Sequence, residues 1–165
     1  MLEESTVGII VTDGDPRSNR DSSLMGAAFR YRNSRLPGGK LVEAQAWYQQ
    51  TDNTDINGQS IDGEDRAYGV GVSLPSVTGW RAGYAQKVIE ENYFPAVGFI
   101  DRTGVRDTQA NFGYQYRKRD SDGWLRGIYT GIDYYRQDLL DSGQLDTEIL
   151  SLRLWSIDSN RNDRT

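Results

Sequence analysis

Bulky apolar residues alternate with small or polar residues, with a period of two, along most of the chain. In AYGVGVSL, residues 67–74, the even-numbered positions are bulky and apolar and the odd-numbered positions are small. Successive side chains of a β-strand point to opposite faces of a sheet, so the pattern predicts a strand with two different surroundings. Comparable alternation predicts strands over 6–12, 23–32, 40–50, 66–74, 80–88, 108–117, 124–135 and 147–155.

The segments between these strands differ in length at the two ends of the expected sheet. Short, turn-like segments at 33–39, 75–79 and 119–123 alternate along the chain with longer ones at 13–22, 51–65, 89–107 and 136–146. Outer-membrane barrels have this layout, and soluble barrels share it. The predicted fold class is all-β. We expect an antiparallel up-and-down meander of about eight strands that forms part or all of a β-barrel, as a single domain over residues 1–165.

Strand parity separates an apolar face from a polar, glycine-rich face. Its apolar members include Met25, Phe29, Val42, Val70, Val72, Tyr84, Phe112, Ile128 and Ile132. Its polar members, which would line a lumen, include Arg30, Arg32, Glu43, Gln45, Arg81, Lys87, Asn111 and Gln115. Because a small soluble barrel fills its interior with large apolar side chains, this polar face favours a water-filled lumen and an apolar face against lipid.

Aromatic residues on the apolar parity lie near the ends of the predicted strands. Those toward the short-turn end are Tyr31, Trp80, Tyr116 and Trp124, and those toward the long-loop end are Tyr48, Tyr68 and Tyr134. Two aromatic girdles around an apolar band are typical of barrels that span a lipid bilayer. The alternative is a two-layer sheet or a soluble barrel whose apolar face packs on protein.

Composition narrows the classes of function. The net charge of −5 and the pI near 4.8 argue against a nucleic-acid partner, since phosphate binding needs a basic surface. The absence of cysteine and histidine excludes disulfides, thiol nucleophiles, the usual zinc sites and histidine bases. No cofactor is predicted. The start MLEESTVGII lacks the pattern of a signal peptide.

The stretch ENYFPAVGFIDRTGVRD, with GIIVTDGDP and SSLMGAAFRYRN before it, resembles a family of bacterial proteins. Members join an N-terminal carbohydrate-binding family-9-like domain to a C-terminal domain of unknown function resembling an outer-membrane β-barrel. The residues that carry the resemblance are Asn92, Phe94, Pro95, Gly98, Phe99 and Arg102. It implies that this chain is a fragment of the C-terminal domain, placed in the outer membrane of a Gram-negative bacterium. Carbohydrate would then bind through a missing upstream domain; the resemblance brings no catalytic residues.

The FPAVGF segment predicts a constrained loop with a plug-like structural role. Pro95 fixes its own backbone and favours an extended Phe94. Phe94 and Phe99 could fold back as hydrophobic anchors, and Arg102 could pair with a lumen carboxylate such as Glu43 or Asp133.

Other motifs give weaker signals for chemistry. NTDINGQSIDGE imitates a calcium loop through Asn53, Asp55, Asn57 and Glu64, but its flanks predict strands where an EF-hand needs helices, so we predict a hairpin loop and no metal site. Trp47, on the polar parity with Trp155, is a candidate for stacking on sugars. No catalytic residues are predicted; a glycoside-processing enzyme would need Glu43 or Asp133.

Three hypotheses of function follow, in order. The first is an outer-membrane barrel segment with a polar lumen, which anchors or serves transport for a carbohydrate-binding partner domain. The second is a soluble β-barrel module that binds a small polar or sugar ligand inside. The third is a glycoside-processing enzyme.

Overall fold

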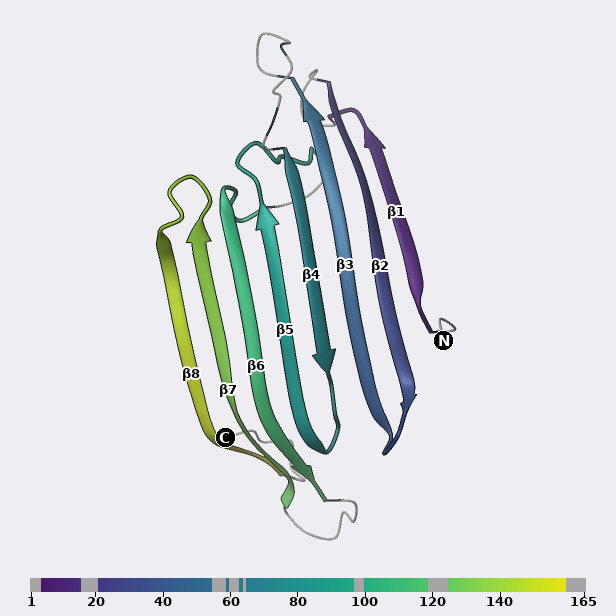
Figure 1. Ribbon diagram of the computed structural model, residues 1–165, viewed down its shortest axis with the longest axis vertical. Helices are drawn as coiled ribbons and strands as arrows, with labels where there is room; N and C mark the ends of the chain where they lie inside the picture. The colour runs from purple at the N-terminus through teal and green to yellow at the C-terminus, as the bar shows by residue number, and fades with distance from the viewer. Residues whose placement is uncertain are drawn as a thin grey trace.

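The computed structural model describes residues 4–15, 21–54, 59, 63, 65–96, 100–118 and 125–159. They form one eight-stranded antiparallel sheet in which the strands follow their chain order (Figure 1). The strands are β1(Thr6–Asp13), β2(Ser22–Leu36), β3(Lys40–Asn53), β4(Arg66–Leu74), β5(Gly79–Ile89), β6(Val105–Arg117), β7(Leu125–Leu139) and β8(Leu145–Ser159). The predicted all-β, up-and-down meander is confirmed. No helix in the described part of the chain is long and apolar enough to cross a membrane.

Several strands extend beyond their predicted ends. β2, β7 and β8 each contain 15 residues, and β3 contains 14. Their added residues are largely polar or break the alternation, as in Asn33–Leu36 and Arg136–Leu139. Ladder hydrogen bonds join backbone groups whatever the side chain, so pairing continues where the sequence signal has already stopped.

The two ends of the sheet have most of the expected asymmetry. The β2–β3 and β4–β5 connections, at the lower end in Figure 1, span 3 and 4 residues, and the β1–β2, β3–β4 and β5–β6 connections, at the upper end, span 8, 12 and 15. The long connection expected over 136–146 is wrong, because β7 and β8 extend into it and leave only residues 140–144 between them. The tightest hairpin joins β2 to β3 through Gly38 and Gly39, with φ angles of 77° and 68°. The Gly39 N–H donates to the Leu36 carbonyl, so Pro37 and Gly38 are the central residues of the turn. A proline at the first central position and a positive φ at the second suit this turn, which explains the glycine at 38.

The sheet has two free edges. Among the described residues, β1 pairs with β2 alone and β8 pairs with β7 alone. Both edge strands carry strongly exposed apolar side chains, including Ile9 at 80% and Leu150 at 70% exposure. An unpaired edge with apolar residues is a template for pairing with another strand.

An irregularity in β8 changes the face of one residue assigned from sequence. Tyr129 pairs with Ser156 and Gly131 with Arg153, so β8 has one extra residue between these pairs. Beyond this bulge the parity shifts, and Trp155 shares the parity of Ile157, which pairs with Ile128. The polar parity assigned to Trp155 is therefore wrong.

Side chains are buried at the long-loop end of the sheet. The buried hydrophobic residues of the described chain are Leu24, Ala67, Val88, Tyr93 and Val105, and all lie in or beside strand ends that meet the long loops. Leu24, Ala67 and Tyr93 form one cluster, against which Trp47, Ile89 and Ile100 pack. The core is thus small and off-centre.

Candidate functional site

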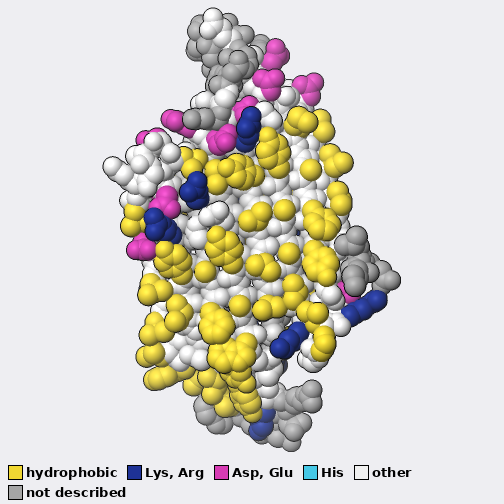
Figure 2. Space-filling model, in the orientation of Figure 1, with side chains coloured by type: hydrophobic (Ala, Val, Ile, Leu, Met, Phe, Trp, Pro, Cys, Tyr) yellow, Lys and Arg dark blue, Asp and Glu magenta, His cyan; other side chains and the backbone are white. Residues whose placement is uncertain are grey.

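The apolar face is a broad exposed surface. Figure 2 shows hydrophobic side chains over most of this face, with acidic side chains mainly toward its upper end and basic ones near both ends. Val70 in β4 and Phe112 in β6 are each 54% exposed. Soluble monomers rarely expose apolar patches larger than a few hundred Å², and larger ones mark contact with protein or membrane.

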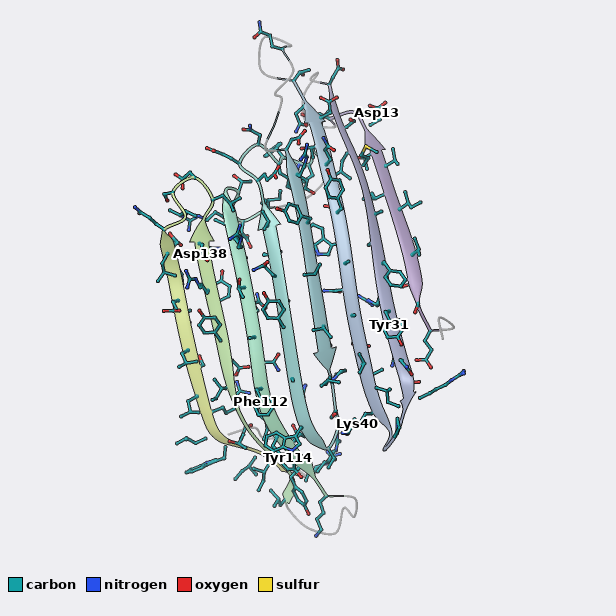
Figure 3. The ribbon with its side chains drawn as sticks, in the orientation of Figure 1. Asp13, Tyr31, Lys40, Phe112, Tyr114 and Asp138 are labelled. Carbon is teal, nitrogen blue, oxygen red and sulfur yellow. The ribbon has the colours of Figure 1, made fainter. Side chains whose placement is uncertain are left out.

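The predicted girdle residues remain on this face. Tyr48, Tyr68, Trp80 and Tyr116 are exposed, Tyr31 and Tyr134 are partly exposed, and Trp124 lies outside the described residues. Trp80 stacks on Phe112, with ring centres 5.0 Å apart, and meets Tyr114 edge-on at 5.2 Å. Figure 3 labels Phe112 and Tyr114 near the lower end of the sheet. Trp80, Phe112 and Tyr114 therefore form one connected aromatic cluster.

Charged residues border the apolar face at the long-loop end. The Arg136 guanidinium lies 2.8 Å from the Asp138 carboxylate. Next to this pair, the Tyr134 hydroxyl donates a hydrogen bond of 2.7 Å to Glu148. Asp13 and Asp138 both lie toward this end in Figure 3. The order from apolar to aromatic to charged residues along this surface matches the order from the hydrocarbon core of a bilayer through its interface to water.

The polar face contains a hollow of about 350 Å³. It is lined from β2 to β6 by polar-face residues Arg30, Glu43, Gln45, Gly71, Ser73, Gly83, Ala85, Gln109 and Asn111. The small residues of β4 and β5 leave space that larger side chains would fill. This explains the small positions of AYGVGVSL, and it brings together four of the predicted lumen residues: Arg30, Glu43, Gln45 and Asn111.

Glycines on the polar face also make room for aromatic rings. A Cβ added at Gly69 would lie 2.8 Å from Nε1 of Trp47. A Cβ at Gly113 would lie 2.6 Å from both the Tyr129 hydroxyl and the Thr130 carbonyl oxygen, and one at Gly131 would meet the same hydroxyl. Trp47 therefore lies over Gly69 of the neighbouring strand, and Tyr129 lies over Gly113 of β6 and Gly131 of its own strand; a side chain at any of these glycines would displace the ring.

Two arginines share the ring of Tyr129. The guanidinium carbon of Arg81 lies 5.7 Å from the ring centre, and that of Arg153 lies 5.5 Å from it. Cations within about 6 Å of an aromatic ring are attracted by its negative face. Arg81 was predicted to lie on the polar face. Tyr129 and Arg153 were not named among the polar-face residues, although the alternation in their strands places them on that face.

Two further cations of the polar face, Arg32 and Lys87, are paired. Arg32 lies 3.7 Å from Glu43 and 3.9 Å from Glu4. Lys87 lies 3.0 Å from the buried Asp107, which also accepts a 2.7 Å hydrogen bond from the Gln137 amide. Gln115, the remaining predicted lumen residue, donates a 3.4 Å hydrogen bond to the backbone carbonyl of Tyr116.

The described residues of the connection between β5 and β6, 90–96 and 100–104 and called here the capping loop, pack against the long-loop end of the polar face. Tyr93 is 4% exposed, joins the Leu24 and Ala67 cluster, and donates its hydroxyl hydrogen bond to Gln49. The predicted anchor Phe94 is wrong, because its side chain is 66% exposed. Phe99 and Gly98 lie outside the described residues.

Hydrogen bonds fasten the capping loop on both sides. The Asn53 amide donates to the Phe94 carbonyl at 3.0 Å, and the Asn92 amide donates to the Gly63 carbonyl at 2.9 Å. Toward β8, the Arg102 guanidinium makes two hydrogen bonds to Asp146, of 2.7 and 3.1 Å. Hydrogen bonding to Asp146 raises the pKa of Arg102.

Asp146, and neither Glu43 nor Asp133, is therefore the partner of Arg102. The sequence could not predict this partner, because Arg102 and Asp146 lie 44 residues apart and come together only when the strands are assembled in the sheet. Pro95 is half-buried in the same loop. The expected plug-like role stays a prediction, and the loop has the contacts that such a role needs.

The candidate catalytic and metal residues are not assembled into a site. Glu43 lines the 350 Å³ hollow, whereas Asp133 lines a neighbouring hollow that shares Gln109 and Asn111 with it. Trp47 is half-buried against the core, with its ring over Gly69. Of the calcium-like positions only Asn53 is described, and it accepts a 2.6 Å hydrogen bond from Ser22; Asp55, Asn57 and Glu64 lie outside the described residues. No group of three potential metal ligands occurs among the residues described.

Comparison of the chain with protein-family models, with curated proteins and with solved structures finds no match.

Proposed function

We propose that the chain forms part of the wall of an outer-membrane-type β-barrel, with the apolar face toward lipid and the polar face toward a water-filled lumen. The observation that carries the proposal is the division of the sheet. Large apolar side chains are exposed on one face, and the other face holds small, polar and charged ones. Lipid removes the cost of exposing apolar surface to water, about 25 cal/mol per Å².

The edges and the capping loop agree with a barrel wall. Barrels have no edges, so β1 and β8 would pair with further strands or with each other in the closed form. The capping loop would restrict one mouth of the lumen. The family resemblance adds the expected setting: a Gram-negative outer membrane and a carbohydrate-binding partner domain, which the barrel would anchor or serve in transport.

A soluble binding module is the second candidate. The 350 Å³ hollow favours it, because pockets for small ligands begin at about 300 Å³. In that case the apolar face would pack on protein, and the folded chain would stay monomeric in buffer without detergent or lipid.

Fluorescence quenching by brominated lipids separates the two candidates. One variant keeps Trp80 and replaces the other tryptophans with phenylalanine; the matched control keeps Trp47, on the polar face. After refolding into vesicles, we expect strong quenching of Trp80 and little quenching of Trp47. Folded, lipid-free protein with neither residue quenched would support the soluble module, and equal quenching of both would contradict the assigned faces.

Conductance tests the transport part separately. Alanine at lumen charges such as Arg30 and Arg81 should change the ion conductance of a reconstituted barrel. Unchanged conductance in a folded barrel would leave the anchoring role and remove transport.

A further inference from the structure

The middle of the polar face has a charge opposite in sign to that of the chain. Its described basic side chains are Arg30, Arg32, Arg81, Lys87 and Arg153, and its acidic ones are Glu43, Asp107 and Asp133. The whole chain has a net charge of −5. Acidic residues are therefore concentrated elsewhere, as at the charged border of the apolar face.

Pairing increases this imbalance. Glu43 neutralises Arg32, and Asp107 neutralises Lys87. No carboxylate oxygen of the described residues lies within 4.0 Å of the guanidinium of Arg30, Arg81 or Arg153. On the described polar face, the unpaired charges that remain are these three arginines and one carboxylate, Asp133, which lines the neighbouring hollow.

Two of the three arginines converge. They lie in one row across four strands: Arg81 of β5 pairs with Gly113 of β6, Gly113 with Gly131 of β7, and Gly131 with Arg153 of β8. The Tyr129 ring occupies the space above the two glycines, and both guanidiniums approach this ring. The third, Arg30, lines the 350 Å³ hollow with amide side chains Gln45, Gln109 and Asn111 and with Glu43, which pairs with Arg32.

We infer that the polar face binds small oxyanions, carboxylates or phosphates, through Arg81 and Arg153 at Tyr129 and through Arg30 at the hollow. A guanidinium presents paired N–H donors that match two oxygens of a carboxylate or phosphate. Rings of arginine and lysine also line pores for anions and phosphate. The inference deepens the proposed function and rests on it, because it names the class of solute that a wetted polar face would favour.

Titration of the full chain in detergent micelles with inorganic phosphate tests the inference. Nuclear magnetic resonance of the arginine Nε–H groups follows each guanidinium, and ionic strength is held constant with sodium chloride. Arg→Lys variants assign the signals while keeping the charge. We expect saturable shifts at Arg30, Arg81 and Arg153, and none at the paired controls Arg32 and Arg102. R81Q should weaken the response of Arg153 severalfold, whereas R32Q should leave it unchanged.

Three results would overturn the inference: no shift at the three arginines, equal shifts at all arginines, or the same shifts with chloride alone. Arginine signals that all coincide, as in an unfolded chain, would contradict the fold on which the inference depends. Failure here is distinguishable from failure of the proposed function. The lipid-quenching experiment reports on Trp80 of the opposite face and does not involve these arginines.

Discussion

The two faces of this sheet share every backbone hydrogen bond and differ in almost everything else. On the apolar face, Val70 is exposed, and Trp80 contacts the rings of Phe112 and Tyr114. The polar face has specific side-chain contacts of three kinds: ion pairs such as that of Lys87 with Asp107, aromatic rings that lie over glycines, and the packing of the capping loop through Tyr93.

This difference shows where specificity lies in the fold. The apolar face repeats one property over many strands and needs only a medium or a partner that covers it. The polar face depends on particular pairs, and one altered side chain leaves a partner without its contact. We therefore expect substitutions on the two faces to differ in both size and cause.

The largest effect is expected in the capping loop. Tyr93→Ala should lower the free energy of unfolding by about 3–5 kcal/mol, because it removes a buried aromatic ring from a small core. Phe94→Ala, at the exposed neighbouring position, should change it by about 0.5 kcal/mol or less. Denaturant unfolding of both variants in the same detergent measures the difference. Equal losses would place the anchor of the loop elsewhere.

A charge in the middle of the apolar face should have the next largest effect. In lipid vesicles, Val70→Arg should cost about 2–4 kcal/mol, as expected for arginine facing the bilayer midplane. Gln109→Arg, at an exposed position of the polar face, should cost about 0.5 kcal/mol or less. Reversible unfolding from vesicles gives both values. If Val70→Arg is tolerated as well as its control, the apolar face does not contact lipid.

A substitution beneath the Tyr129 ring, at Gly113, should have a smaller effect on the free energy of unfolding. Gly113→Ala should cost about 1–3 kcal/mol, since its Cβ would collide with Tyr129 and a backbone oxygen. Gly71→Ala is the matched control, because its Cβ would meet nothing closer than 3.5 Å. Unfolding experiments should find the control neutral or slightly stabilised. A neutral Gly113→Ala would show that Tyr129 does not depend on that space.

The smallest effect concerns Glu4, outside the strands. A hydrogen bond from the Ser34 hydroxyl, at 2.6 Å, lowers the pKa of Glu4 below its usual value of 4.5. The contribution of Glu4 to folding stability is therefore complete above the pKa of the unfolded state, and it is lost as pH falls through the lower pKa of the folded state. Carbon NMR of the Glu4 carboxyl should show this, and Ser34→Ala should raise the pKa toward 4.5. An unchanged pKa in the variant would exclude Ser34 as the cause.

The strands and their faces could be predicted because both follow from a period of two. Alternation located all eight strands and placed Arg30, Glu43, Gln45 and Asn111 on one face, where the hollow gathers them. The ends were less predictable, since strands such as β2 continue through polar residues. In the capping loop no period applies, so the choice between Tyr93 and Phe94 had no basis in the sequence.

The sequence by itself determined the amphipathic meander, because a strand's side chains alternate wherever it lies. Tertiary structure decided the partners: Asp146 for Arg102, Asp107 for Lys87, and Tyr129 for the two unpaired arginines. It also decided the parity of Trp155, through a bulge that no local pattern marks. These contacts join residues far apart in the chain. They depend on strand register and loop path, which only the assembled sheet defines.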